Sequence, residues 1–450
     1  MRSGGWSQAA VRLAILCIWW GSPVAAGVES TPAYSSELAV PGRANATPAI
    51  AAEDDVVVVA WGASLPSGAT DVFVALSRDR GRTFGAPSRV NDVEGDARLT
   101  GEQPPRITLA GRIVNLVWTA KGANGTRLLQ SRSSDGGRTF AKATIVPGAD
   151  APGNRGWENT AVDRRGRVFA VWLDHRELAR QDAQVASGHH EHMAGTTPAA
   201  GGRPDGVAMA QQSKLFIGSL DAAIAPRAIT GGVCYCCKTA IAVGPDGAIY
   251  SAWRHVYPGN IRDIAFSVSR DGGRTFAAPA RVSEDKWVLE GCPDDGPAMA
   301  VDAVNRVHIV WPTLVNEGGD DTIALFYATF RGSEWGRSGV RPHSDPTLTP
   351  SDGASFTPRQ RIPTSGMPHH PQIAIAADGK PVIAWDEGAA GRRVAAIAHI
   401  GGPSPRSVFT REVLADAAVY PVIAPVGDRI VAAWTSGKSA ASVIRIEVRQ

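Results

Sequence analysis

Four cysteines downstream of the first 30 residues offer the most distinctive chemistry in this chain. Three of them form the run Cys234-Tyr235-Cys236-Cys237, and the fourth is Cys292. Thiolates are soft ligands that suit copper(I) and zinc, so such a run can hold a metal ion. An even number of cysteines in an exported protein more often forms disulfides, whose pairing the sequence does not give. Both interpretations stay open.

Histidines extend the set of candidate metal ligands, because imidazole suits copper and zinc. A His- and Met-containing run, residues 188–193, precedes a Gly-, Pro- and Thr-rich stretch. It is either a solvated loop or a transient metal contact. His175, at the root of this loop, is better placed to be ordered. The full set of candidate ligands for copper or zinc is Cys234, Cys236, Cys237, Cys292, His175, His255, His369 and His370.

Seven tryptophans mark the elements that must position these residues. Each closes a short apolar strand, and the spacings run from 49 to 81 residues; they are Trp61, Trp118, Trp172, Trp253, Trp311, Trp385 and Trp434. An inner strand such as 371–375 precedes each of them, often across an Asp-Gly turn. A third strand such as 263–268 and a short fourth strand such as 280–282 follow. Such a repeat predicts an all-β fold, a β-propeller of four-stranded blades.

The ends of the chain indicate how the ring of blades closes. We count seven blades, with six as the alternative. The last unit stops at its third strand, 442–448, and the segment 37–40 before the first unit can supply the missing outer strand. This closure removes a free sheet edge, which would otherwise invite aggregation.

One face of such a propeller gathers most of the candidate residues. It carries the loops that lead into the inner strands and the loops that follow each repeat tryptophan. Seven of the ten histidines and all four downstream cysteines fall in these loops. Loops on a rigid scaffold commonly carry function, so we expect the site on this face.

Three copies of an S-x-D-x-G-x-T-F motif connect third and fourth strands, at 77–84, 133–140 and 269–276, with a degenerate copy at 351–356. They resemble the Asp-box (BNR) repeats of the sialidase-like propeller superfamily, and the resemblance covers roughly residues 37 to 450. The Ser, Asp and Thr side chains of such a motif can hydrogen-bond the turn backbone. We therefore expect the motif to staple turns rather than to catalyse.

The resemblance also implies catalytic residues. Sialidases hold the substrate carboxylate with three arginines and use a tyrosine nucleophile, a glutamate that assists it and an aspartate as acid/base. On this basis Tyr420 is the candidate nucleophile, Glu158 or Glu387 its activator, and Asp174 the acid/base. Arginine pairs with a carboxylate through two parallel hydrogen bonds. The candidate ligand-binding residues are Arg106, Arg176, Arg254 and Arg262, with Asp294 and Asp295 on the same loop face. The family's Arg-Ile-Pro motif is missing near the first blade, since Arg361-Ile362-Pro363 falls late in the chain. The sequence therefore favours glycan binding over classical sialidase activity.

Composition and the N-terminal sequence indicate where the protein is located and which partners it excludes. The formal charge of +3 gives no electrostatic case for nucleic acid. Residues 1–26 read as a Sec-type signal peptide, with two arginines, a short apolar core and small residues before Gly27. We expect a secreted or periplasmic protein with no transmembrane segment in its mature chain. We further expect a monomer with one propeller domain, 27–450, and an insertion at 177–204 in the third blade.

Three functions stay open from the sequence. The first is an exported sialidase-like propeller that binds a glycan at the loop face and, if it is an enzyme, hydrolyses it as a glycoside hydrolase. The second is a periplasmic protein that binds copper or zinc through its Cys and His loops. The third is a non-catalytic scaffold that binds another protein, for which we expect a broad exposed apolar patch.

Overall fold

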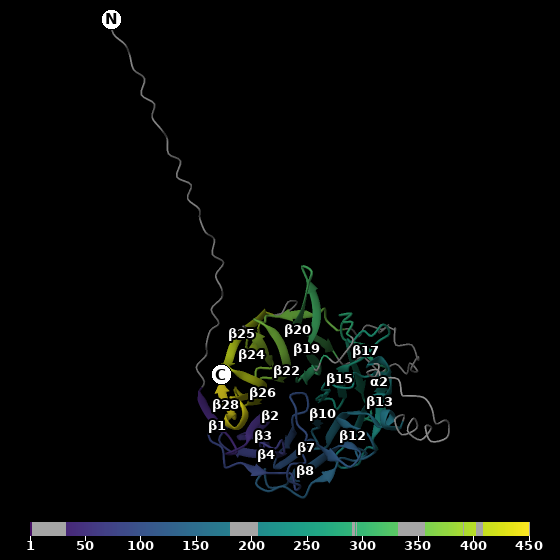
Figure 1. The fold of residues 1–450 in the computed structure, drawn as a ribbon, viewed down its shortest axis with the longest axis vertical. Helices are drawn as coiled ribbons and strands as arrows, with labels where there is room; N and C mark the ends of the chain where they lie inside the picture. The colour runs from purple at the N-terminus through teal and green to yellow at the C-terminus, as the bar shows by residue number, and fades with distance from the viewer. Residues whose placement is uncertain are drawn as a thin grey trace, which may run out of the picture.

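The computed structural model describes residues 1, 33–180, 206–289, 293, 295–331, 356–389, 391–401 and 408–449. Within these ranges the chain forms seven four-stranded antiparallel sheets. The sheets follow one another around a common centre (Figure 1). The fold is therefore the predicted all-β propeller, and its blades number seven rather than six.

The first three blades run outward from the centre in chain order. Blade 1 consists of β2 (Ala44–Glu53), β3 (Val56–Ser64), β4 (Thr70–Ser77) and β5 (Ser88–Arg89). Blade 2 consists of β6 (Arg106–Ala110), β7 (Ile113–Gly122), β8 (Gly125–Ser133) and β9 (Thr144–Ile145). Blade 3 consists of β10 (Arg155–Val162), β11 (Val168–Asp174), β12 (Lys214–Ser219) and β13 (Arg227–Gly231).

The next three blades repeat this order. Blade 4 consists of β14 (Ala240–Val243), β15 (Ile249–Arg254), β16 (Ile264–Ser269) and β17 (Ala280–Arg281). Blade 5 consists of β18 (Ala298–Val301), β19 (Arg306–Glu317), β20 (Asp320–Arg331) and β21 (Gln360–Ile362). Blade 6 consists of β22 (Met367–Ile375), β23 (Pro381–Ala389), β24 (Arg392–Gly401) and β25 (Val408–Asp416).

Blade 7 joins the two ends of the described chain. Its strands are β26 (Ala418–Val426), β27 (Arg429–Ser436), β28 (Val443–Arg449) and, outermost, β1 (Tyr34–Leu38). Glu37 and Leu38 pair with Arg445 and Ile444 of β28. The predicted closure by the N-terminal segment is confirmed, although the strand begins three residues earlier than 37.

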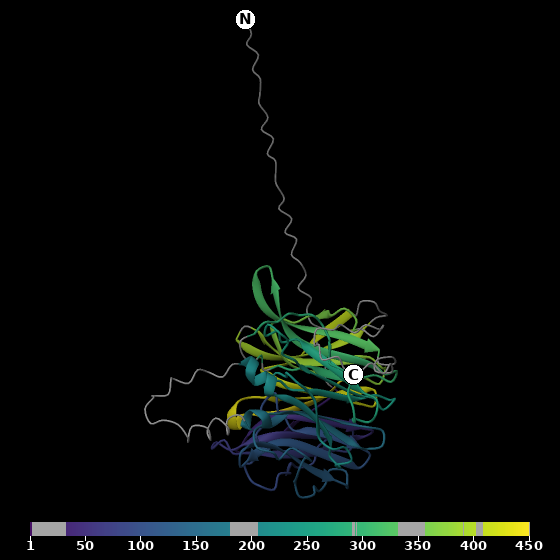
Figure 2. The ribbon, with the colours of Figure 1, turned by 90° about the vertical axis from the view of Figure 1, so that its right-hand side faces the viewer.

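Three short helical stretches of the described chain lie in loops that follow repeat tryptophans. They are residues 176–180 and α2 (Gly206–Gln212) in blade 3 and the 3-10 turn η1 (Ser439–Ala441) in blade 7. Seen edge-on, α2 lies at one face of the disc of blades (Figure 2). No helix in the described ranges has the length and apolar character needed to cross a membrane. Residues 2–32 and 181–205, with the predicted leader and most of the predicted insertion, lie outside these ranges.

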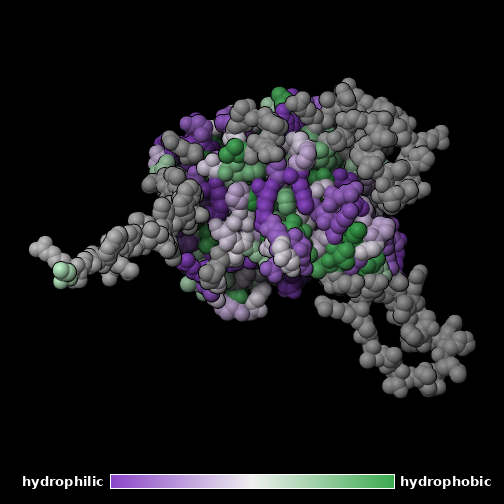
Figure 3. Space-filling view, turned by 90° about the horizontal axis from the view of Figure 1, so that it is seen from above, coloured by the Kyte–Doolittle hydropathy of each residue, from purple (hydrophilic) through white to green (hydrophobic). Residues whose placement is uncertain are grey.

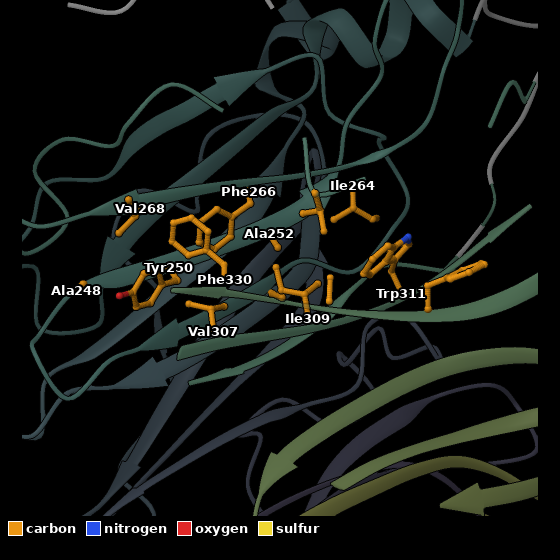
Figure 4. Packing of buried hydrophobic residues seen from close by; sticks show 14 of the residues in the cluster. Ala248, Tyr250, Ala252, Ile264, Phe266, Val268, Val307, Ile309, Trp311 and Phe330 are labelled. Atoms are coloured by element: carbon orange, nitrogen blue, oxygen red, sulfur yellow. The ribbon is translucent and has the colours of Figure 1, made fainter. Parts of the chain in front are cut away.

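The core lies between neighbouring blades, because each blade is apolar on both faces. Figure 4 shows one such layer, in which side chains of blades 4 and 5 interleave. Phe266 of β16 has its ring centroid 5.2 Å from that of Phe330 and 5.9 Å from that of Tyr250. Truncating a buried phenylalanine of this kind to alanine costs about 3–5 kcal/mol.

The repeat tryptophans are fully buried, and their indole N–H groups must be satisfied. In three blades the acceptor is the residue two positions later, which faces the same side of the strand. Trp172 donates to Asp174 (3.2 Å), Trp253 to His255 (3.3 Å) and Trp385 to Glu387 (2.8 Å). Trp118 is followed at this position by alanine and has no indole partner among the described residues. Trp61 and Trp311 donate instead to Asn45 (2.9 Å) and Asp285 (2.7 Å). We call Asp174, His255 and Glu387 indole anchors.

The three Asp boxes form the turn staples that the sequence predicts. In the second copy the Ser133 hydroxyl donates to Asp135 (2.7 Å) and accepts from the backbone of Gly137 (2.8 Å). Thr139 donates to the same carboxylate through both its backbone and its hydroxyl. These bonds hold the pKa of Asp135 well below its ordinary value. Residues 351–355 of the degenerate copy lie outside the described ranges.

Candidate functional site

A β-bulge opens the inner strand in four blades and sets the direction of the side chains there. Two residues of the inner strand lie opposite each repeat tryptophan in blades 1, 3, 6 and 7. The first of the two has a left-handed backbone, with φ of 55° at Thr47, 53° at Trp157, 50° at His370 and 57° at Tyr420. Large side chains rarely adopt this conformation, and such residues concentrate at functional sites.

Strand register places one equivalent residue in each remaining blade. In the four bulged blades, the left-handed residue lies two positions before the inner-strand residue that pairs with the neighbour preceding the tryptophan. The same count in blades 2, 4 and 5 gives Pro104, Lys238 and Gly296. Lys238 therefore occupies in blade 4 the position that His370 and Tyr420 occupy in blades 6 and 7. Proline follows this position in five blades, as Pro48, Pro105, Pro297, Pro371 and Pro421.

Residues from opposite parts of the ring meet near these positions, which places them at the propeller axis. One ligand atom each of Glu102, Asp295 and His370 lies within 4.8 Å of the others. Glu102 precedes the inner strand of blade 2, Asp295 precedes that of blade 5, and His370 lies in that of blade 6. Blades this far apart around the ring can touch only at its centre. We call Glu102, Lys238, Asp295, His369, His370, Asp386 and Tyr420 the axial cluster.

Glu102 is held at the centre by backbone donors. Its Oε2 accepts hydrogen bonds from the backbone N–H groups of Lys238 (2.8 Å) and Gly296 (3.1 Å). Its Oε1 is buried and has no partner among the described residues. Burial raises the pKa of Glu102 to about 7. The carboxyl group can therefore hold or release a proton near neutral pH.

Lys238 brings a buried positive charge to the same place. Its Nζ donates to the carbonyl of Pro371 at 2.8 Å. Burial lowers the pKa of Lys238, while the charges of Glu102 and Asp295 oppose this effect. Gly296 permits the close approach, since a Cβ there would lie 2.0 Å from the Lys238 carbonyl oxygen.

His369 and His370 each contact a buried carboxylate. Nδ1 of His369 lies 2.5 Å from Oδ2 of Asp295, and the backbone N–H of His370 donates to Oδ1 of the same residue at 2.9 Å. Nδ1 of His370 lies 2.7 Å from Oδ1 of Asp386, which Arg393 also contacts. Burial alone would lower the pKa of His370, yet Asp386 raises it above its ordinary value. A charged imidazole is thus favoured at the axis.

Tyr420 packs its ring edge-on against His370, with ring centroids 4.7 Å apart. Gly101 lies beside both side chains. A Cβ at Gly101 would lie 2.3 Å from Cε1 of Tyr420 and 2.9 Å from Nε2 of His370. Glycine is therefore required at 101 for the imidazole and the phenol to keep these positions.

Glu158 and Arg106 form a second buried layer beside the cluster. Nε of Arg106 donates to the carbonyl of Glu158 at 2.7 Å, and the Glu158 carboxylate accepts from the Thr119 hydroxyl at 2.9 Å. Nη2 of Arg106 and Oε1 of Glu158 are buried without partners in the described ranges. Burial raises the pKa of Glu158 and lowers that of Arg106.

The other three predicted arginines contact the fold itself. Arg254 donates to the carbonyls of Asp295, Arg262 and Pro312, and Arg262 donates to the carbonyl of Leu289. Arg176 pairs with Asp174 and lies over the ring of Phe216 in blade 3. The structure thus directs these guanidinium groups to carbonyls and to a buried carboxylate, and does not bring them together as a carboxylate-binding trio.

Three of the predicted site residues, Asp174, His255 and Glu387, are indole anchors of repeat tryptophans. His175 packs against Trp157, the bulge residue of blade 3, with ring centroids 5.4 Å apart. Glu387 also accepts hydrogen bonds from the backbone of Ser365 and from Arg411. Burial lowers the pKa of both His175 and His255 to about 4, so both imidazoles are neutral at pH 7.

The cysteine run lies just before the inner strand of blade 4. Cys234 and Cys237 are free and buried, with their sulfurs 3.6 Å apart. The sulfur of Cys236 lies 3.7 Å from that of Cys234, but Cys236 is disulfide-bonded and so offers no thiolate to a metal ion. Nη1 of Arg262 donates to the Cys234 sulfur at 3.1 Å. Cys292 and Asp294 lie outside the described residues.

Sequence reasoning selected only part of the axial cluster. Asp295, His369, His370 and Tyr420 were predicted site residues, and the structure brings them together. Glu102, Lys238 and Asp386 were not selected. Signals for all three exist: Glu102 and Asp386 fall in loops of the predicted face, and Lys238 stands at the repeat position that proline follows in five of the other six blades.

A cavity of about 450 Å³ lies away from the axis, between blades 2 and 3. Ile113 and Gly166 in its wall follow the first turn of their blades, at the opposite ends of the inner strands from the axial cluster. Its basic residues are Arg132, Lys142, Arg165 and Arg167.

Hydrophilic and hydrophobic residues are intermingled over the edge of the disc (Figure 3). The exposed large hydrophobic residues of the described chain are spread over several blades, with Met367 and Val408 both in blade 6.

Comparison with known proteins identifies the fold class. No protein-family model matches the chain, and no curated protein matches it. An ulvan lyase, a polysaccharide lyase bound to a GlcA(1-4)Rha3S unit, aligns with 93% of this chain and 94% of its own at 10% identity and a TM-score of 0.50. The intramolecular trans-sialidase of Ruminococcus gnavus covers 82% of this chain and 94% of its own, with 12% identity and a TM-score of 0.46. The chain has a sialidase-like β-propeller fold, as the Asp boxes indicated.

Proposed function

We propose that the axial cluster binds a glycan and acts on it by acid–base catalysis. The observation that supports this most directly is the convergence of Glu102, Asp295 and His370 from three separate blades, with Tyr420 against the imidazole. Sugars offer hydroxyl donors and acceptors on an apolar ring. A few convergent polar groups beside an aromatic ring suit such a ligand.

The two groups that would move protons are Glu102 and His370. Asp386 holds Nδ1 of His370, which leaves Nε2 for a ligand. Oε1 of Glu102 has no partner in the described ranges. With its pKa raised by Asp386, His370 would serve as the general acid, and Glu102, with a pKa of about 7, as the base. The phenol of Tyr420 would bind the sugar beside them.

This assignment leaves two reaction types, which their products separate. Hydrolysis adds water and creates a new reducing end, whereas elimination leaves an unsaturated sugar. The ulvan lyase that shares this fold is a polysaccharide lyase, so elimination belongs in the test alongside hydrolysis.

The experiment is to incubate the purified protein with a panel of neutral, uronate-containing and sialylated polysaccharides. Reducing ends and ultraviolet-absorbing unsaturated products are then measured. We expect His370→Gln and Glu102→Gln to lower activity by about 100-fold or more, as loss of a general acid or base does. His399→Gln, on β24 of the same blade, is the matched control and should keep full activity. Equal activity of all variants would refute the assigned roles, and failure to bind any polysaccharide would refute the function.

The proposed localisation and oligomeric state rest on the sequence. We propose that the protein is exported through residues 1–26 and acts as a secreted or periplasmic monomer. N-terminal sequencing of the protein from an exporting host should give Gly27 as the first residue. An intact Met1, or a mass in solution above that of one chain, would contradict these two points.

A further inference from the structure

Arg262 is a fully buried guanidinium group that has no carboxylate partner in the described chain. It donates to the Leu289 carbonyl at 3.0 Å, to Oδ1 of Asn260 at 3.1 Å and to the sulfur of Cys234 at 3.1 Å. Arginine does not lose its proton in proteins, and a buried charge requires a compensating charge. Of these three acceptors, only the sulfur can carry a negative charge.

A second buried guanidinium group adds to this positive field. Arg254 is 1% exposed, donates only to backbone carbonyls among its described partners, and lies over the ring of Trp287 at 4.7 Å. The sulfur region therefore faces two fixed positive charges. It favours a bound species that carries negative charge.

The thiol of Cys237 lies close enough to that of Cys234 for both sulfurs to bind the same metal ion. Cys237 is 2% exposed, and its sulfur is 3.6 Å from that of Cys234. This separation is well beyond the roughly 2.05 Å of a disulfide bond. The apolar residues Ala210 and Val256 pack around the thiols. No histidine or carboxylate of the described chain belongs to this group of sulfur ligands.

We propose that Cys234 and Cys237 form a buried copper(I) site. Copper(I) is soft and accepts two thiolate ligands, whereas structural zinc demands four. One copper(I) ion between two thiolates carries a net charge of −1, which the neighbouring guanidinium groups stabilise. Binding would release the Cys237 proton, as metal binding to a thiol requires. The site shares no residue with the axial cluster, although Cys237 directly precedes Lys238 and Arg254 donates to the carbonyl of Asp295.

The test uses the full mature protein, reduced and handled without oxygen. Copper(I) is supplied as its acetonitrile complex, and a chromogenic copper(I) chelator competes for it. We expect one copper per chain by native mass spectrometry, with ultraviolet thiolate-to-copper absorption. The double variant Cys234→Ser/Cys237→Ser should lose this copper, while Ala210→Ser, a buried change in the same cluster, should keep it.

A second variant separates metal binding from misfolding. Arg262→Met should weaken copper(I) binding by about 10- to 100-fold, the usual effect of a residue that supports a metal ligand. Arg262→Lys should recover part of the loss because it restores the charge. Copper retention by the double cysteine variant would overturn the proposal. So would tighter binding of zinc than of copper(I), or a native protein whose Cys234 and Cys237 are joined in a disulfide.

Discussion

Asp174 offers a direct test of whether a predicted catalytic acid is in fact an indole anchor. Its carboxylate accepts from the Trp172 indole and from two arginines, Arg155 at 3.1 and 3.2 Å and Arg176 at 2.7 and 2.8 Å. Asp174 and Arg155 are fully buried. Asp174→Asn keeps the size and one acceptor but removes the charge that both guanidinium groups require.

The expected loss of stability is large because Arg155 would remain buried and unpaired. Removing one partner of a buried ion pair typically costs about 3–5 kcal/mol. At roughly 2 °C for each kcal/mol, Tm should fall by about 6–10 °C. Asp221→Asn is the matched control in the same blade, because its partner Arg167 is 43% exposed and such surface pairs contribute about 1 kcal/mol or less.

The assay is thermal unfolding followed by circular dichroism, with activity measured per folded molecule. Burial alone would raise the pKa of Asp174, yet Arg176 and Arg155 hold it below its ordinary value. The stability it contributes is therefore present above about pH 4 and is lost as the pH falls through the folded pKa. The gap between wild type and Asp174→Asn should narrow in acid. An unchanged Tm together with lost activity would refute the anchor role and favour the predicted acid/base role.

Three further predictions concern the axis, the turns and the closure. Because the pKa of folded Glu102 is raised to about 7 from 4.5, ionisation should destabilise the fold as pH rises from about 5 to 8; Glu102→Gln should flatten this trend in Tm, and an unchanged slope would contradict it. Ser133→Ala, which removes the buried hydroxyl of an Asp box, should lower the free energy of unfolding in urea by about 1–2 kcal/mol, whereas no change would show that the staple is dispensable. Deleting residues 33–38 should expose the edge of β28 and cause concentration-dependent association in light scattering; a monomeric product of unchanged Tm would argue against closure by β1.

The sequence carried enough information to predict the propeller and its closure. The tryptophans recur because each must fill the same space between blades, and alternation of apolar residues marks the strands around them. The pairing of Leu38 with Ile444 was predictable because the last unit lacked one strand. These features depend on local pattern, which a single sequence displays.

The site was harder to predict because burial and partners decide what a polar residue does. Asp174 and Glu387 looked catalytic as acids in loops near the tryptophans, yet their carboxylates accept the indole N–H two residues back. Glu102 looked ordinary, but the backbone of Lys238 and Gly296 holds it in a buried position that raises its pKa to about 7. Such contacts join blades 2, 4 and 5, and no local pattern reports them.

Two positions of the blade repeat carry polar residues in several blades, and their roles differ. The residue two positions after the tryptophan accepts the indole N–H in blades 3, 4 and 6, so packing constrains its choice there. The second position is the bulge residue of the inner strand or its equivalent, and its residue type varies among the blades: it is threonine, lysine, histidine and tyrosine at 47, 238, 370 and 420. Because the backbone at three of these four is left-handed, the fold bears a conformational cost to present those side chains. Substituting Tyr420 by glycine should thus relieve backbone strain and remove the ring that packs on His370, so a gain or small loss in Tm joined to a loss of glycan binding would separate the two effects.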